Sequence, residues 1–119
     1  MVGALSYAAG LAAEDQVLGT YLAAGHRLCR RRWRGKGGEI DLILRDRTGR
    51  GLIFVEVKCS ATHARAAERL GQHQLRRILA AASEYLAGEP AGQDTEMRLD
   101  LALVDGVGRI EILENAALN

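Results

Sequence analysis

Two apolar runs interrupted by charge, EIDLIL at residues 39–44 and LIFVEVK at residues 52–58, decide the fold of this 119-residue chain. Both are short and rich in branched residues, which is typical of β-strands. The polar segment 45–51 between them contains two glycines, which indicates a hairpin connection. Strands as apolar as these are usually covered on both faces. We therefore expect them at the centre of a sheet with helices packed on it.

The remaining pattern extends this sheet. We expect residues 35–38 (GKGG) to form a turn or a bulged strand entry, and residues 88–96 to form a loop. The other elements are expected as helices at residues 5–24 and 64–87 and as strands at 27–34, 97–104 and 109–113. The order is helix, three strands, helix, two strands. It predicts an α/β fold, a mixed β-sheet flanked by helices, in one domain spanning residues 1–119.

Composition excludes several classes of protein. Hydrophobic residues make up 48% and charged residues 26%, close to globular averages and unlike disordered, collagen-like or coiled-coil chains. No Lys or Arg precedes Arg27, so the uncharged first thirteen residues lack the basic region of a secretory signal. They are also shorter than the roughly 20 residues that span a bilayer. Cys29 and Cys59 are too few for a disulfide framework, and we expect a cytoplasmic protein without membrane contact.

The net charge of +1 hides a strong asymmetry. Residues 1–83 hold 14 basic and 7 acidic side chains, whereas residues 84–119 hold 2 basic and 8 acidic ones. Residues 27–36 contain six basic side chains and no acidic one. Such a cluster suits a nucleic-acid backbone, and a solvated basic edge strand is the alternative. The candidate phosphate contacts are Arg30, Arg31, Arg32, Arg34 and Lys36.

Charged residues intrude on both central strands. Glu39 and Asp41 stand two apart in the first strand and are expected to share a face. Glu56 and Lys58 stand two apart in the second, with Val57 pointing the other way. If the two strands pair through their hairpin, four charged groups converge on one patch. The alternative is two unrelated surface pairs on an edge strand.

A converged patch favours a metal ion. Burying an ionised group costs several kcal/mol unless it is paired or bound to a metal, and three carboxylates against Lys58 leave a charge of about −2. Oxygen ligands without cysteine or histidine favour Mg²⁺ or Mn²⁺. A lysine beside such an ion can stabilise developing charge on a phosphodiester and orient the attacking water.

At these residues the sequence resembles the PD-(D/E)XK nuclease superfamily, with the restriction-endonuclease-like fold. The matching pattern is Asp41 followed by Glu56-Val57-Lys58. Over nearly the whole chain the sequence also resembles the YraN-like family of small, largely uncharacterised bacterial proteins. That wider match runs through Glu14, Tyr21-Leu22, Gly25, Trp33-Arg34, GEIDLI at 38–43, FVEVK at 54–58, Tyr85-Leu86, RLD at 98–100 and EILENA at 111–116.

The resemblance implies roles for individual residues. Asp41 and Glu56 would be metal ligands and Lys58 the catalytic lysine, with Glu39 as an accessory carboxylate. Glu14 would be the helix carboxylate of the family. Gln72 and Gln74 stand where relatives often place a polar or basic side chain, and Gln74 replaces the family's lysine. Arg32 stands where the family usually has asparagine before the tryptophan.

Other residues are expected to be structural. We expect Trp33 in the core, Arg98 and Asp100 in an ion pair, and Cys59 on the face opposite Lys58. Arg76 and Arg77 could contact phosphate or simply be solvated.

Three functions follow from these expectations. The leading one is a Mg²⁺- or Mn²⁺-dependent endonuclease acting on DNA, with branched or damaged DNA as candidate substrates and a homodimer as a candidate assembly. The second is a nucleic-acid-binding or adaptor module that keeps the nuclease fold without catalysis. The third is a structural subunit whose acidic C-terminal third docks on a basic partner.

Overall fold

The architecture comes from a computed structural model that describes residues 2–116, with side chains from residue 10 onward. The elements in chain order are α1 (Val2–Ala23), β1 (Arg27–Arg34), β2 (Glu39–Arg45), β3 (Gly51–Cys59), α2 (His63–Glu68), α3 (Gln72–Leu86), the short 3-10 helix η1 (Gly92–Asp94), β4 (Glu96–Val104) and β5 (Ile110–Leu113). The strands form one mixed sheet in the order β1-β2-β3-β4-β5. The α/β fold predicted from the sequence is therefore confirmed.

The two apolar runs form the predicted hairpin. β2 and β3 pair antiparallel, from Arg45 opposite Leu52 to Leu42 opposite Val55. β3 then pairs in parallel with β4, and α2 and α3 make the crossover between them. At one edge of the sheet β1 pairs antiparallel with β2, and at the other edge β5 pairs antiparallel with β4. β3 thus has a paired strand on each side.

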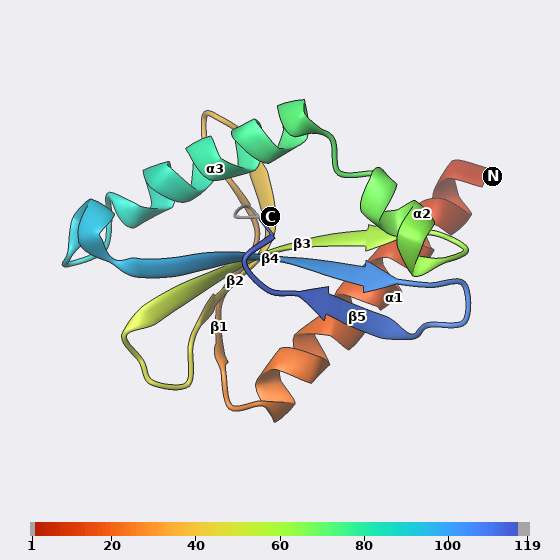
Figure 1. Cartoon of the computed structure of the whole chain (residues 1–119), viewed down its shortest axis with the longest axis horizontal. Coiled ribbons are helices and arrows are strands. Elements are labelled where there is room, and N and C mark those ends of the chain that lie inside the picture. Colours follow the sequence, from red (N-terminus) through yellow and green to blue (C-terminus); the bar gives the residue numbers. More distant parts are fainter. Residues whose placement is uncertain (1, 117–119) are drawn as a thin grey trace.

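Helices cover both faces of the sheet, as the apolar runs predicted (Figure 1). On one face, Ala13, Val17 and Tyr21 of α1 pack against β2, β3 and β4. On the other face, α3 packs through Ile78 against Phe54 and its neighbours, and α2 packs against β4. Trp33 is half-buried on the α3 face, with its ring edge-on to Tyr85 at 5.3 Å, so its predicted place in the core is confirmed.

The prediction of one long helix at residues 64–87 is wrong in one respect. The structure has two helices, α2 and α3, which are separated by Arg69–Gly71. Gly71 has extended backbone angles and forms the N-cap of α3, and glycine is a poor helix former. The break redirects the chain, because Ala66 of α2 packs against Leu101 and Leu103, whereas α3 packs against β2 and β3.

The alternation of β2 breaks at Asp41. Leu42 lies in the α1-side core, but Ile40, two residues earlier, lies in the α3-side core. Opposite this point Arg32 has a φ of 50°, a left-handed conformation that asparagine tolerates better than arginine. Glu39 and Asp41 still line one cavity together with Glu14 of α1, as their expected position on a common face requires.

The glycine-rich turn 35–38 packs directly on α3. A Cβ atom at Gly37 would lie 2.8 Å from the Cβ of Ala80, and one at Gly38 would lie 3.1 Å from a backbone oxygen of α3. The Glu84 carboxylate accepts hydrogen bonds from the Lys36 and Gly37 amides at 3.0 and 3.2 Å. Glycine is needed because larger side chains would push the turn off the helix.

A buried polar network joins α1, β4 and the C-terminal segment. Asp100 has no exposed surface and accepts hydrogen bonds from the Tyr21 hydroxyl at 2.7 Å, Arg98 Nε at 3.1 Å and the Asn115 amide at 3.2 Å. The predicted ion pair between Arg98 and Asp100 is confirmed.

No helix within residues 2–116 combines the length and the apolar character needed to cross a lipid bilayer.

Candidate active site

The candidate site lies where β2 and β3 separate. The regular pairing of the two strands ends at Leu42 and Val55. Beyond it, Asp41 Oδ2 accepts a hydrogen bond from the Val57 backbone amide at 2.8 Å. The Asp41 carboxylate therefore takes the place of the β2 backbone carbonyl that would accept this hydrogen bond in a regular strand pair. Because N–H and C=O of one strand residue point to the same side, the Val57 carbonyl also faces the Asp41 side of β3.

Glu56 is buried next to Asp41. It is 5% exposed, and its pKa is raised from 4.5 to about 9, first by burial, then by a hydrogen bond to the Asp41 side chain and by the charge of Asp41. The charge of Lys58 opposes this shift, and the charge of Glu39 adds to it. The four charged groups singled out in the sequence therefore act on one another in the folded chain. The raised pKa of Glu56 favours its protonated form beside Asp41.

A cavity of about 330 Å³ opens beside Asp41, and we call it the carboxylate cavity. Asp41, Glu39 and Glu14 supply its acidic lining. Glu14 comes from α1, is 4% exposed and is held by two arginines of β1. The structure therefore brings the helix carboxylate next to the two β2 carboxylates, although about 25 residues separate them in sequence. Arg32 also lines this cavity.

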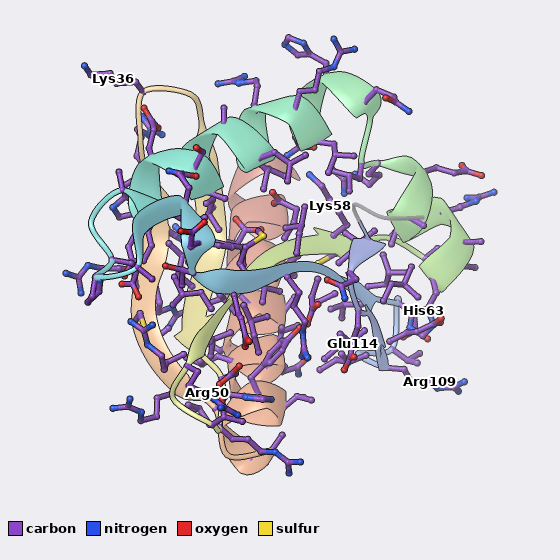
Figure 2. The ribbon with its side chains drawn as sticks, turned by 60° about the vertical axis from the view of Figure 1, so that its left-hand side comes forward. Lys36, Arg50, Lys58, His63, Arg109 and Glu114 are labelled. Atoms are coloured by element: carbon purple, nitrogen blue, oxygen red, sulfur yellow. The ribbon has the colours of Figure 1, made fainter. Side chains whose placement is uncertain are left out.

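A second cavity, of about 610 Å³, lies at the C-terminal ends of the parallel strands β3 and β4, and we call it the strand-end cavity. Lys58 and Arg69 are its basic lining residues. It shares Gly10, Val57 and Cys59 with the carboxylate cavity. Figure 2 shows Lys58 on β3 beneath the junction of α2 and α3. Substrates of open α/β sheets commonly bind at the carboxyl ends of strands.

Cys59 does not belong to the charged group. Its side chain packs with the α1-side core, on the face opposite Lys58, as expected from the sequence. Burial raises the pKa of its thiol, which keeps the thiol protonated and makes it a poor nucleophile.

The basic residues of β1 are largely neutralised. Arg31 contacts Glu14 at 3.1 Å and Asp15 at 2.6 Å, and Arg32 contacts Glu14 at 3.3 Å. Arg34 contacts Glu39 at 2.9 Å.

The other two candidate phosphate contacts, Arg30 and Lys36, have no carboxylate partner within the described part of the chain. Arg30 donates to the neighbouring Cys29 carbonyl. Lys36 stands at the outer tip of the turn between β1 and β2 (Figure 2).

The two glutamines are placed elsewhere. Gln72 lines a cavity of about 600 Å³ between the start of α3 and β5, together with apolar residues such as Leu113. Gln74, one turn into α3, is half-buried. Neither lines the carboxylate cavity or the strand-end cavity.

Two arginines gain importance only from the structure. Arg69 lines the strand-end cavity with Lys58. Arg77 lines a cavity of about 280 Å³ between the turn 35–38 and α3, which we call the turn cavity. The sequence offered Arg77 only as one of two exposed helix arginines and offered no signal for Arg69. Its position depends on the helix break that follows it.

The donor set fits a hard divalent cation. Within residues 10–116, no three Asp, Glu, His or Cys side chains form a preassembled metal cage. Mg²⁺ commonly uses only one or two carboxylates and keeps several waters or substrate oxygens. Asp41 and Glu56, two neighbouring carboxyl groups, meet that requirement. The Val57 carbonyl on the same side of β3 is a further oxygen donor.

Comparison with known proteins gives a family but no activity. The family model described as "Uncharacterised protein family UPF0102" matches residues 13–104. A UPF0102 protein of Cereibacter sphaeroides is 57% identical over 116 residues, which cover 98% of this chain and 97% of the relative. A UPF0102 protein of Ruegeria pomeroyi is 58% identical over 114 residues, which cover 96% of this chain and 91% of the relative. A UPF0102 protein of Dinoroseobacter shibae is 45% identical over 116 residues, which cover 98% of this chain and 85% of the relative.

Proposed function

This chain belongs to the uncharacterised protein family UPF0102, the YraN-like family, and we propose that it is a divalent-metal-dependent nuclease of the PD-(D/E)XK type that hydrolyses phosphodiester bonds in DNA. One observation carries the proposal. Two carboxyl groups, Asp41 and Glu56, are in contact where two central strands separate, and Glu56 is buried with a raised pKa. Such a pair destabilises the fold unless a ligand uses it, and perturbed carboxyl groups beside a cavity favour a catalytic role.

A bound metal ion would supply Lewis-acid activation of a phosphodiester and would lower the pKa of a bound water. Asp41 and Glu56 would hold it through their carboxylate oxygens. The hydrogen bond from the Val57 amide fixes the Asp41 carboxylate in place. Lys58, close enough to stabilise the ionised form of Glu56, orients the attacking water and balances charge on the phosphate.

Glu39 adds negative charge at the edge of the site and is itself held by Arg34. Glu14 closes the α1 side of the carboxylate cavity, with two arginines of β1 balancing its charge. These two residues therefore position the site and set its potential. Their oxygens are available to a second cation only if the arginines move.

The proposal includes three further parts. The substrate is DNA, with branched or damaged structures as the first candidates, because phosphate contacts without base readout favour backbone or structure selectivity. The protein acts in the cytoplasm, which agrees with its free Cys29 and Cys59. The active form is a homodimer, which size-exclusion chromatography with light scattering can test.

Cleavage of plasmid, single-stranded and branched DNA in Mg²⁺ or Mn²⁺ tests the activity. We expect Asp41→Asn, Glu56→Gln and Lys58→Ala each to lower the cleavage rate by at least about 100-fold. Glu68→Gln, an exposed carboxylate on α2, is the matched control and should cleave like the wild type. Mn²⁺ titration calorimetry gives a second readout, with binding lost in the Asp41 and Glu56 variants and retained in the Lys58 variant.

A non-catalytic nucleic-acid-binding or adaptor role is the second candidate function. The absence of a preassembled three-ligand cage among residues 10–116 favours it. DNA binding that survives Asp41→Asn and Lys58→Ala, with no cleavage and no Mn²⁺ binding by the wild type, would select this role over the nuclease.

Part of the acidic C-terminal third serves the fold itself. Glu84 holds the turn 35–38, Glu89 pairs with Arg45 at 2.6 Å and Asp100 pairs with Arg98. Asp105 accepts hydrogen bonds from two backbone amides. These four acidic groups are used inside the fold, whereas Asp94, Glu96, Glu111 and Glu114 are exposed.

A further inference from the structure

Three cavities neighbour one another in a row, because each shares lining residues with the next. The turn cavity and the carboxylate cavity share Glu39. The carboxylate cavity and the strand-end cavity share Gly10, Val57 and Cys59. A ligand chain can therefore run from the turn 35–38, past Asp41, to the C-terminal ends of β3 and β4.

Charge alternates along this row. The turn cavity is lined by Arg34, Lys36 and Arg77 against the single carboxylate of Glu39. The carboxylate cavity in the middle is acidic. The strand-end cavity has Lys58 and Arg69 against the single carboxylate of Asp105. Positive ends around an acidic centre match a polyanion whose central phosphate meets a metal ion while its flanking phosphates meet cations.

The cations at the two ends differ from those of β1. Arg77 donates to the Gly37 carbonyl at 3.3 Å, and Arg69 donates to the Cys59 carbonyl at 2.8 Å. Among the described residues, neither guanidinium has a carboxylate partner. One of the five N–H donors of each is engaged, and four are available for phosphate oxygens. Arg31 and Arg32, in contrast, are balanced by Glu14.

Both arginines are held on a fixed framework. The turn that Arg77 contacts is fixed to α3 by Glu84 and by the close approach of its glycines. Arg69 is the C-cap of α2, whose Ala66 is fully buried. Prepositioned donors lose little entropy when they bind a phosphate.

We propose that this row of cavities is the path of one unpaired nucleic-acid strand, with Arg77 and Arg69 holding the phosphates on either side of the one that is cut. The proposal rests on the proposed nuclease function and names its substrate class. Arg77 and Arg69, which line this row without a carboxylate partner among the described residues, lie at its two ends. Three of the five β1 arginines that could contact a second strand are already paired with carboxylates. Fully paired DNA is therefore a poorer ligand than a single-stranded end, flap or gap.

Binding without cleavage tests the path. A short fluorescein-labelled DNA strand and its duplex are titrated with the protein in EDTA, and anisotropy is followed from about 50 to 200 mM salt. We expect tighter binding of the single strand. Arg77→Ala and Arg69→Ala should each weaken it roughly tenfold and lower the slope of log affinity against log salt by about 0.7, the value of one single-strand phosphate contact.

The controls are neighbours of the two arginines. The control variants are Arg76→Ala and Arg65→Ala. Arg76 lies beside Arg77 on α3, and Arg65 lies one turn before Arg69 on α2. Neither residue lines the row of cavities. Both should bind within about twofold of the wild type. Arg77→Lys and Arg69→Lys keep the charge and should recover most of the salt slope. Circular dichroism checks that each variant is folded.

The possible outcomes distinguish failure of the proposed strand path from failure of the proposed nuclease activity. If Arg77→Ala and Arg69→Ala bind like their controls, or weaken only duplex binding, the path is wrong even if the wild type cuts DNA. If they lose single-strand binding while the wild type cuts nothing in Mg²⁺ or Mn²⁺, the path stands as a binding surface and the nuclease proposal fails.

Discussion

Replacing Glu56 with glutamine tests whether the buried carboxyl pair destabilises the metal-free protein and is stabilised by a bound cation. Glu56 is 5% exposed, and burial together with Asp41 raises its pKa to about 9. An acid whose folded pKa lies above its unfolded value keeps its proton in the folded chain. Between the two values the folded state binds the extra proton, so stability falls as the pH rises.

The size of the effect follows from the linkage. One proton changes the free energy of unfolding by about 1.4 kcal/mol per pH unit. Between about pH 6 and pH 8, the metal-free wild type should lose roughly 1–3 kcal/mol from this group. Glu56→Gln carries no proton to lose, and its amide can still donate to Asp41. The variant should therefore be the more stable protein at about pH 8.

Urea unfolding in EDTA at several pH values measures this difference, with Glu68→Gln as the exposed control. Adding Mn²⁺ should stabilise the wild type by an amount that grows with its concentration, and should leave Glu56→Gln unchanged. A wild-type pH slope that persists in Glu56→Gln would refute the protonation of Glu56 in the folded chain. Equal stabilisation of both proteins by Mn²⁺ would refute Glu56 as a ligand.

Three further substitutions test the framework around the site by urea unfolding. Glu14→Ala leaves two arginines of β1 without their buried partner and should cost about 1–3 kcal/mol. A wild-type stability would mean that the arginines simply turn to solvent. Gly37→Ala places a methyl group 2.8 Å from a Cβ of α3 and should cost about 1–3 kcal/mol, whereas Gly71→Ala, with open space around it, should cost less. Equal losses would contradict the close approach of the turn. Tyr21→Phe removes the 2.7 Å hydrogen bond to Asp100 and should cost about 1–2 kcal/mol, with no loss expected if water replaces the hydroxyl.

The central hairpin and its charged residues could be predicted because they depend on local pattern. Apolar runs of strand length, separated by a polar glycine-containing segment, have few alternatives to a paired and covered hairpin. The charged residues Asp41, Glu56 and Lys58 stood out because charge is costly in such runs. The long helix was predicted wrongly at Gly71, since a single glycine within an alanine- and leucine-rich stretch is compatible with either a continuous or a broken helix.

What the sequence determined by itself was the identity of the strands and the presence of charge on the two central ones. The tertiary structure decided where that charge acts. The break in alternation at Asp41 lies opposite the left-handed backbone of Arg32 in the neighbouring strand. The arginines of β1 are neutralised because α1 carries Glu14 across the sheet to them, and Arg69 reaches the row of cavities because the chain turns after α2. These contacts join residues far apart in the chain, and periodicity carries no information about such distances.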